Sequence, residues 1–252
     1  MKNLIKTSAA VITAALLGAC SFDQATPPCA VGHGGYGAQY THVSGNTSGA
    51  CFRKGDIIGV QKYRSVDSDV QTVHLRPEVI GFGQGLPGVD EPDLTSDGEL
   101  TGPRPGADGF CTAPSLSVAT GVTNAGDYEL SYAFSNVRFY VQGAVPGTQF
   151  TADLTISSTD EACSSTYTVQ ALYPVVFCND FREATDNRPE GTGAPSEELC
   201  DEPDHLYSHY SANPLFDSTC NEVGNYAEDL DWLDIGQAWH LCTPTTAVPS
   251  LK

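Results

Sequence analysis

The middle of the chain alternates apolar and polar side chains over short stretches. Between residues 127 and 173 the alternation occurs in four stretches, in which about every second residue is apolar: DYELSYAF, NVRFYVQG, QFTADLTIS and TYTVQALY. A period of two is typical of antiparallel strands that bury one face. Weaker alternation predicts three further strands: DIIGVQKY, QTVHL and PSLSVAT.

The strand-rich part of the chain and its end differ in composition. Residues 29–180 carry the alternating stretches and predict a mainly β fold, with an antiparallel β-sandwich-like core. Residues 181–252 are acidic, rich in cysteine and irregular, which predicts a C-terminal lobe tied by disulfides. Within this lobe only NYAEDLDWLDIGQAWHL hints at a helix. Residues 81–110 are rich in Gly, Pro and Asp, and we expect a functional excursion or a disordered insert there.

The start of the chain has the build of an export signal. Lys2 and Lys6 give a short positive region. An apolar stretch of about a dozen residues follows, whereas a membrane-spanning helix needs about twenty. Small residues stand where a signal peptidase cuts, which predicts a cleaved signal over residues 1–19. An uncleaved anchor or an ordinary N-terminal strand is the alternative.

The residues at the end of this stretch, Leu17–Cys20 (LGAC), resemble the lipobox of bacterial lipoproteins. In that class the signal is cut before the cysteine, whose sulfur is diacylated and whose new amino group usually receives a third chain. The resemblance implies that Cys20 anchors the protein in the bacterial cell envelope. Ser21 is not aspartate, which implies the outer membrane under the sorting rule of enteric bacteria. Residues 20–28 then form a lipidated tether, whose extended part reaches only about 26 Å.

The chain has nine cysteines, and assigning Cys20 to lipid leaves an even number. An even number in an oxidising compartment predicts four disulfides. No CxxC motif occurs, so the sequence gives no support to a structural zinc site or a thioredoxin-type redox site. The eight cysteines expected to form disulfides are Cys29, Cys51, Cys111, Cys163, Cys178, Cys200, Cys220 and Cys242.

The pairing of these cysteines is only partly constrained by the sequence. An extended stretch separates Cys163 from Cys178, and it is too long for those two to bond to each other. A glycine-rich loop that closes easily favours the pair Cys29–Cys51. A polar, irregular segment similarly favours the pair Cys200–Cys220.

The chain is strongly acidic, with a formal net charge of −19. Removal of the signal takes away Lys2 and Lys6 and no acid, so the mature charge becomes −21. This balance argues against nucleic acid as a partner, and against adhesion of the folded domain to anionic lipid head groups. It permits divalent cations and basic partners, although a solvated acidic surface is the simpler explanation.

One acidic stretch partly resembles a calcium-binding loop. In Asp93–Leu100 the acids Asp93 and Asp97 stand at positions 1 and 5 of an EF-hand pattern, and Gly98 stands at position 6. The bidentate acid that position 12 requires is replaced by Arg104. We therefore expect a turn here, with Asp93 and Asp97 as weak metal candidates, and we expect no cofactor.

Other motifs are weaker. Gly32–Gly37 matches GxGxxG as a string but lacks the preceding strand and following helix of a dinucleotide site, so we expect a flexible or turn-rich loop there. His205 and His209 have helical spacing, but a glutamate of the HExxH type is missing. No GxSxG motif occurs. Further residues that could serve sugar chemistry or stacking are Glu228, Asp229, Asp231, Asp234, Trp232 and Trp239.

Taken together, these patterns favour a non-enzymatic, lipid-anchored envelope protein with a structural or interaction role. Its partners would be the membrane, through the lipid anchor, and a protein or glycan. The alternative is an extracytoplasmic module that binds glycan or calcium. A hydrolase is a third class, which requires acids or a Ser–His pair to converge in a cleft.

Overall fold

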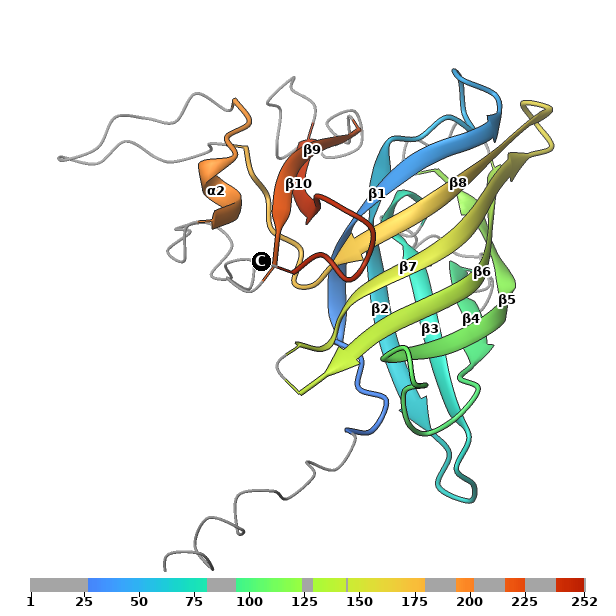
Figure 1. Cartoon of the computed structure of the whole chain (residues 1–252). Helices are drawn as coiled ribbons and strands as arrows, with labels where there is room; N and C mark the ends of the chain where they lie inside the picture. Colours follow the sequence, from blue (N-terminus) through green and yellow to red (C-terminus); the bar gives the residue numbers. More distant parts are fainter. Residues whose placement is uncertain are drawn as a thin grey trace, which may run out of the picture.

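A single antiparallel sheet of eight strands makes up most of the described structure (Figure 1). The computed structural model describes residues 27–80, 94–123, 129–143, 145–179, 194–201, 216–224 and 239–251. The strand order is β4-β3-β2-β1-β8-β7-β6-β5. The strands are β1 (Gly34–Gly45), β2 (Gly55–Arg64), β3 (Gln71–Pro77), β4 (Ser96–Glu99), β5 (Phe110–Val122), β6 (Glu129–Gln142), β7 (Val145–Ser158) and β8 (Cys163–Leu172), and a 3-10 turn, η1 (Glu78–Ile80), follows β3.

The alternating stretches of the sequence form the inner face of this sheet. On β7 the apolar residues Phe150, Ala152, Leu154 and Ile156 are all buried, as the period of two predicts. On β8 the alternate residues Tyr167, Val169 and Ala171 are buried in the same cluster. The mainly β prediction is therefore confirmed.

Strand β6 combines two stretches that the sequence presents as separate strands. Its pairing with β7 shifts register between Ser135 and Arg138, and Asn136 has a φ of 50°. This is the geometry of a β-bulge, which inserts an extra residue and changes which positions face inward. Phe134 before the bulge and Val137 after it are consequently both buried.

The sheet curves until its two edge strands, β4 and β5, meet. The Ser96 hydroxyl donates to the carbonyl of Ser117 over 2.6 Å, and the Asp97 N–H donates to the Ser117 hydroxyl over 2.9 Å. The result is a nearly closed, barrel-shaped sheet whose halves face each other across one core, as a sandwich-like arrangement would. Strand β4 lies within residues 81–110, where a loop was expected, and residues 81–93 lie outside the described residues.

The C-terminal lobe lies beside β1 and β8 (Figure 1). Its described elements are α2 (Glu198–Asp201), β9 (Ser218–Gly224) and β10 (Trp239–Pro244), and the two strands pair in an antiparallel hairpin. The helix expected over NYAEDLDWLDIGQAWHL is wrong at its end, because Trp239 and the two residues after it belong to β10. Residues 225–238 lie outside the described residues.

The lobe packs closely against the sheet at two glycines, Gly37 on β1 and Gly55 at the start of β2. A Cβ atom on Gly37 would lie 3.2 Å from the carbonyl oxygen of Cys242, and one on Gly55 would lie 2.6 Å from a methyl of Val223. Glycine therefore permits the close approach of the hairpin to the sheet. None of the described helices has the length and apolar character needed to cross a membrane.

Candidate functional site

Four disulfides join the eight cysteines of the described chain. They are Cys29–Cys111, Cys51–Cys163, Cys178–Cys220 and Cys200–Cys242. The expected pairs Cys29–Cys51 and Cys200–Cys220 are wrong. The cause is strand order: because β1 lies beside β8, the loop after β1 brings Cys51 to Cys163 at the start of β8.

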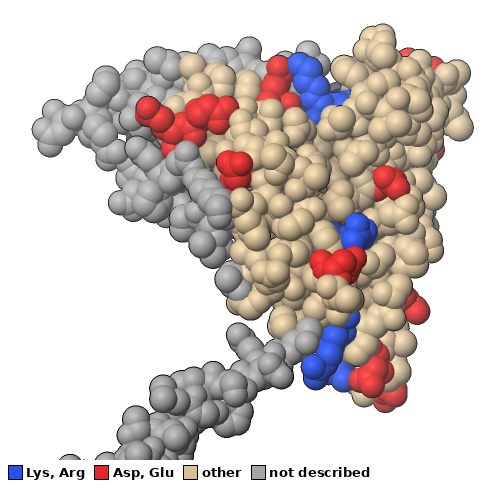
Figure 2. Space-filling model, in the orientation of Figure 1, with Lys and Arg blue, Asp and Glu red and all other residues tan. Residues whose placement is uncertain are grey.

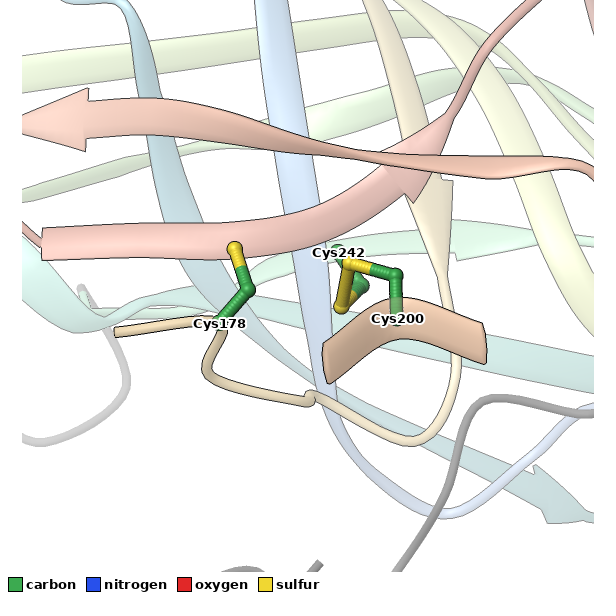
Figure 3. Close-up of side chains that lie close together, drawn as sticks. All are labelled: Cys178, Cys200 and Cys242. Atoms are coloured by element: carbon green, nitrogen blue, oxygen red, sulfur yellow. A yellow bond between two sulfur atoms is a disulfide. The ribbon is translucent and has the colours of Figure 1, made fainter. Parts of the chain in front are cut away.

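The two disulfides of the C-terminal lobe lie against each other. The sulfurs of Cys178, Cys200 and Cys242 all lie within 4.8 Å of one another (Figure 3). A metal is bound by thiolate, and in a disulfide neither sulfur is a thiolate. In this oxidised form the cluster is therefore a covalent brace and not a metal centre.

Backbone N–H groups of three of the four lobe cysteines donate hydrogen bonds to neighbouring segments. The N–H of Cys178 donates to the carbonyl of His240, and the N–H of Cys242 donates to the carbonyl of Val176. The Glu197 carboxylate accepts the N–H of Cys220 over 2.9 Å. These contacts bring residues after β8, before α2 and on β9–β10 to one place, which sequence spacing did not indicate.

A second candidate site lies on the outer face of β2, β3 and β4. Cross-strand pairing places Gly59 opposite Arg76, Gln61 opposite His74, and His74 opposite Asp97. Because Gly59 has no side chain, the surface is hollowed beside it. The hollow has a volume of about 520 Å³, and we call it the outer-face hollow; it is lined by Gly34, Gly59, Val60, Gln61, Tyr63, His74, Arg76 and Thr95.

Linked side chains form one side of the outer-face hollow. The Tyr63 hydroxyl donates to the Gln61 side-chain oxygen. The Tyr63 ring meets the His74 ring edge to face, with centroids 4.7 Å apart, and Nδ1 of His74 lies 2.5 Å from Oδ1 of Asp97. Tyr63 is nevertheless 53% exposed. An exposed aromatic ring among amide, hydroxyl and guanidinium groups is the surface chemistry that contacts sugar rings.

Of the two weak metal candidates, the structure describes Asp97 but not Asp93. Asp97 lies on β4 and faces His74, so the stretch Ser96–Glu99 is a strand where a turn was expected. Asp93 lies outside the described residues, as do Cys20, His205 and His209.

The structure also places two other candidates from the sequence, the glycine string and Trp239. The glycine string at residues 32–37 enters β1, where a turn-rich loop was expected. Trp239 lies on β10, is 7% exposed and packs edge to face on Phe177 with centroids 4.9 Å apart. The Trp239 ring therefore has no exposed face for stacking on a ligand, whereas Gly34 of the glycine string lines the outer-face hollow. The Tyr63–His74–Asp97 arrangement was missed, because it depends on strand register, which the sequence does not show.

Charged side chains on the face drawn in Figure 2 lie scattered among uncharged ones, with basic groups beside acidic ones. Arg138 pairs with Asp108 over 2.6 Å, and Lys54 pairs with Glu222 of β9 over 2.7 Å. A hydrogen bond from the N–H of Phe110, and then the Arg138 guanidinium, hold the pKa of Asp108 below its usual value. Such paired charges differ from the continuous basic surface that nucleic-acid binding needs.

Comparison with known proteins identifies the family. The family model MlpA matches residues 34–174, which is more than half of the chain. The chain belongs to the MlpA family. A Myxococcus xanthus protein named "Putative lipoprotein MlpA" is 28% identical to it over 207 residues, which cover 76% of this chain and 86% of that protein. No solved structure matches.

The MlpA match covers the eight-stranded sheet from β1 to the end of β8. The outer-face hollow and the Cys51–Cys163 disulfide therefore lie within the MlpA region. The lobe disulfides lie beyond the residues that the MlpA model matches. The name of the Myxococcus relative agrees with the lipobox resemblance of Leu17–Cys20.

Proposed function

We propose that this MlpA-family chain is a lipid-anchored protein of the bacterial envelope, in the outer membrane, with a structural or interaction role. The observation that carries the proposal is the Leu17–Cys20 lipobox behind a short apolar segment. The name of the Myxococcus relative supports it. Several acyl chains on Cys20 would hold the protein firmly, since each buried methylene contributes about 0.8 kcal/mol.

The start of the described chain suits attachment to a nearby membrane. Only six residues separate Cys20 from Pro27, and an extended connection of that length spans about 25 Å. Just after it, Cys29 is bonded to Cys111 on β5, and its N–H donates to the carbonyl of Pro103 over 2.9 Å. A pull on the tether would therefore be transmitted to the sheet, and the domain would stay close to the lipid.

Membrane fractionation of the full precursor tests the anchor. We expect Cys20→Ser to move the protein from the membrane fraction to the soluble fraction, and to remove the mass of the acyl chains. Ser21→Ala is the matched control, because it leaves the lipobox cysteine in place and should keep the protein in membranes. A Cys20→Ser variant that stays in the membrane through high-salt washing contradicts the anchor. A density gradient that places the lipidated protein in the inner membrane contradicts the outer-membrane assignment.

The outer-face hollow favours a second candidate function, that of an extracytoplasmic glycan-binding module. Its support is the exposed Tyr63 ring held beside Gln61 and His74 on rigid strands. The calcium alternative has less support among the described residues, because the Asp97 carboxylate lies against His74.

A glycan array followed by calorimetric titration tests this second function. We expect binding that Tyr63→Ala lowers at least tenfold, because stacking on an exposed ring is lost. Val118→Ala is the control, since Val118 is comparably exposed, at 51%, but lies on β5 outside the hollow. A flat response of the native protein, or equal affinity in both variants, contradicts the glycan function.

A further inference from the structure

The cysteines of the C-terminal lobe lie in one cluster although they form two separate disulfides. The sulfur of Cys178 lies within 4.8 Å of both sulfurs of the neighbouring Cys200–Cys242 bond. Thiol–disulfide exchange needs a thiolate beside a disulfide, and here a displaced thiolate would already be in that position. Within the described residues, the Cys29–Cys111 and Cys51–Cys163 disulfides belong to no such cluster.

The fold also permits a second pairing of the same four cysteines. Cys220 on β9 is directly opposite Cys242 on β10. Neither N–H enters the ladder between them, because Cys242 donates to Val176 and Cys220 donates to Glu197. Cα atoms at such a non-hydrogen-bonded pair lie about 4.5 Å apart, which is within the range that a disulfide bridges. A Cys220–Cys242 bond would leave Cys178 and Cys200, whose sulfurs are already close.

We propose that these four cysteines are a thiol–disulfide exchange site, at which an external thiol converts the pairs Cys178–Cys220 and Cys200–Cys242 into Cys178–Cys200 and Cys220–Cys242. The external group belongs to a small thiol or to the reactive cysteine of an oxidoreductase. This inference is independent of the lipid anchor and of the outer-face hollow.

The first step occurs at the most accessible cysteine. Cys220 is half-buried, whereas Cys178, Cys200 and Cys242 are buried. The incoming thiolate attacks Sγ of Cys220, so a mixed disulfide forms there. The Cys178–Cys220 bond breaks, and its electron pair leaves with Cys178 as a thiolate.

Two internal steps complete the exchange. The Cys178 thiolate attacks Sγ of Cys200, which forms Cys178–Cys200 and releases the Cys242 thiolate. The Cys242 thiolate then attacks Sγ of Cys220 across the hairpin, which forms Cys220–Cys242 and returns the external thiolate. Two disulfides are broken and two are formed, so there is no net oxidation or reduction.

The exchange changes how the β9–β10 hairpin is attached. In the observed pairing, one disulfide ties β9 to the segment after β8, and the other ties β10 to α2. In the second pairing, the Cys220–Cys242 bond lies within the hairpin, and the Cys178–Cys200 bond joins the segment after β8 to α2. The hairpin would then cover the outer face of β1, at Gly37, without a disulfide to hold it there. An external thiol would in this way control exposure of that face.

Disulfide mapping of the native protein tests the proposal. The protein is incubated at mildly alkaline pH with a small amount of reduced glutathione, quenched with N-ethylmaleimide and digested without reduction. We expect peptides linked through Cys178–Cys200 and Cys220–Cys242 to appear only when glutathione is added, while Cys29–Cys111 and Cys51–Cys163 stay intact. Recovery of the original four pairs alone overturns the proposal. Scrambling that includes Cys29 or Cys51 also overturns it, because it would reflect general unfolding.

Single variants provide a matched comparison without added thiol. Cys242→Ser leaves the Cys200 thiol beside the Cys178–Cys220 bond, and we expect a Cys178–Cys200 disulfide in the purified variant. Cys111→Ser leaves a Cys29 thiol with no neighbouring cluster, and we expect Cys29 to remain free and alkylatable. If Cys178–Cys220 persists beside a free Cys200 in the first variant, the proposal is wrong.

Discussion

The hydroxyl of Tyr36 on β1 donates a hydrogen bond to the carbonyl of Gly147 on β7, over 2.6 Å and across 111 residues of sequence. The same carbonyl accepts the N–H of Gly32 over 3.0 Å. Gly147 has a φ of +67°, and a Cβ atom on it would lie 1.9 Å from the carbonyl oxygen of Ala30. Tyr36 thus joins the N-terminal segment, the first strand and the start of β7 inside the fully buried core.

Replacement of Tyr36 by phenylalanine tests the contribution of this hydrogen bond. Tyr36→Phe keeps the ring packing but leaves the Gly147 carbonyl with one donor fewer, so we expect the free energy of unfolding to fall by about 1–2 kcal/mol. Tyr63→Phe is the control, because Tyr63 is mostly exposed, and it should cost less than about 0.5 kcal/mol. Urea denaturation measures both values, and equal losses would contradict the role of Tyr36.

The burial of Tyr36 also makes the free energy of unfolding depend on pH in the alkaline range. Desolvation raises the pKa of Tyr36 far above its ordinary value, whereas an unfolded tyrosine ionises near pH 10. Above about pH 10 the unfolded chain therefore loses a proton that the folded chain keeps, and the free energy of unfolding falls as pH rises. We expect Tyr36→Phe to remove this part of the slope between about pH 10 and 11. A slope unchanged in the variant would show that Tyr36 does not cause it.

Gln149 on β7 provides a second test of a buried hydrogen bond, because its side chain holds the segment around Ser250. Its side chain is buried; Nε2 donates to the carbonyl of Ser250 over 2.9 Å, and Oε1 accepts the N–H of Ser250 over 3.0 Å. Gln149→Ala leaves the buried Ser250 N–H without this partner, while the Ser250 carbonyl keeps only the N–H of Asp217 as a donor. We therefore expect a loss of about 1–3 kcal/mol and faster amide exchange at Ser250. Gln170→Ala is the control, because Gln170 bonds the same tail at Thr246 through an exposed hydrogen bond. It should cost less than about 1 kcal/mol.

The sequence predicts the inner face of the sheet wherever a strand keeps its period of two. Strand β7 is such a case, since its apolar residues from Phe150 to Ile156 are all buried. Strand β6 is not, because the bulge at Asn136 changes the inward-facing set in mid-strand and a local pattern then suggests two strands. Strand β4 could not be predicted: Ser96–Glu99 (SDGE) has no strand-favouring side chain, and it pairs because β3 and β5 offer edges on both sides.

For the candidate sites, the sequence predicts which types of residue take part but not which residues lie next to each other. An even number of exported cysteines predicts four disulfides, but the pair Cys51–Cys163 depends on β1 lying next to β8, which is a property of the whole topology. His74 and Asp97 are likewise joined by register between β3 and β4. Local sequence patterns carry information about neighbours along the chain, and these contacts join residues that are distant in sequence.

Two glycines near the end of β1 allow the cost of backbone strain to be measured apart from the cost of steric overlap. Gly45 has a φ of +100°, and a Cβ atom on it would lie 2.2 Å from the carbonyl oxygen of Ser164. Gly49 has a φ of +78° with no atom within 4 Å of the added carbon. We expect Gly49→Ala to lower the free energy of unfolding by about 1–2 kcal/mol from strain alone, and Gly45→Ala to lower it by about 2–5 kcal/mol. Thermal and urea unfolding check the order, and a reversed order would contradict the geometry.

The Cys51–Cys163 disulfide closes the longest loop of the four, with a sequence separation of 112 residues. A bond of this kind acts mainly by restricting the unfolded chain, so the Cys51→Ala, Cys163→Ala double variant should lose about 3–5 kcal/mol of stability. Its unfolded state should also be more expanded and expose more surface, which raises the slope of unfolding free energy against urea. A loss of stability with an unchanged slope would instead indicate that the bond acts through contacts of the folded sheet. The hydrogen bond from the Tyr167 hydroxyl to the carbonyl of Cys51 is such a contact, and Tyr167→Phe in the disulfide-bonded protein measures it separately.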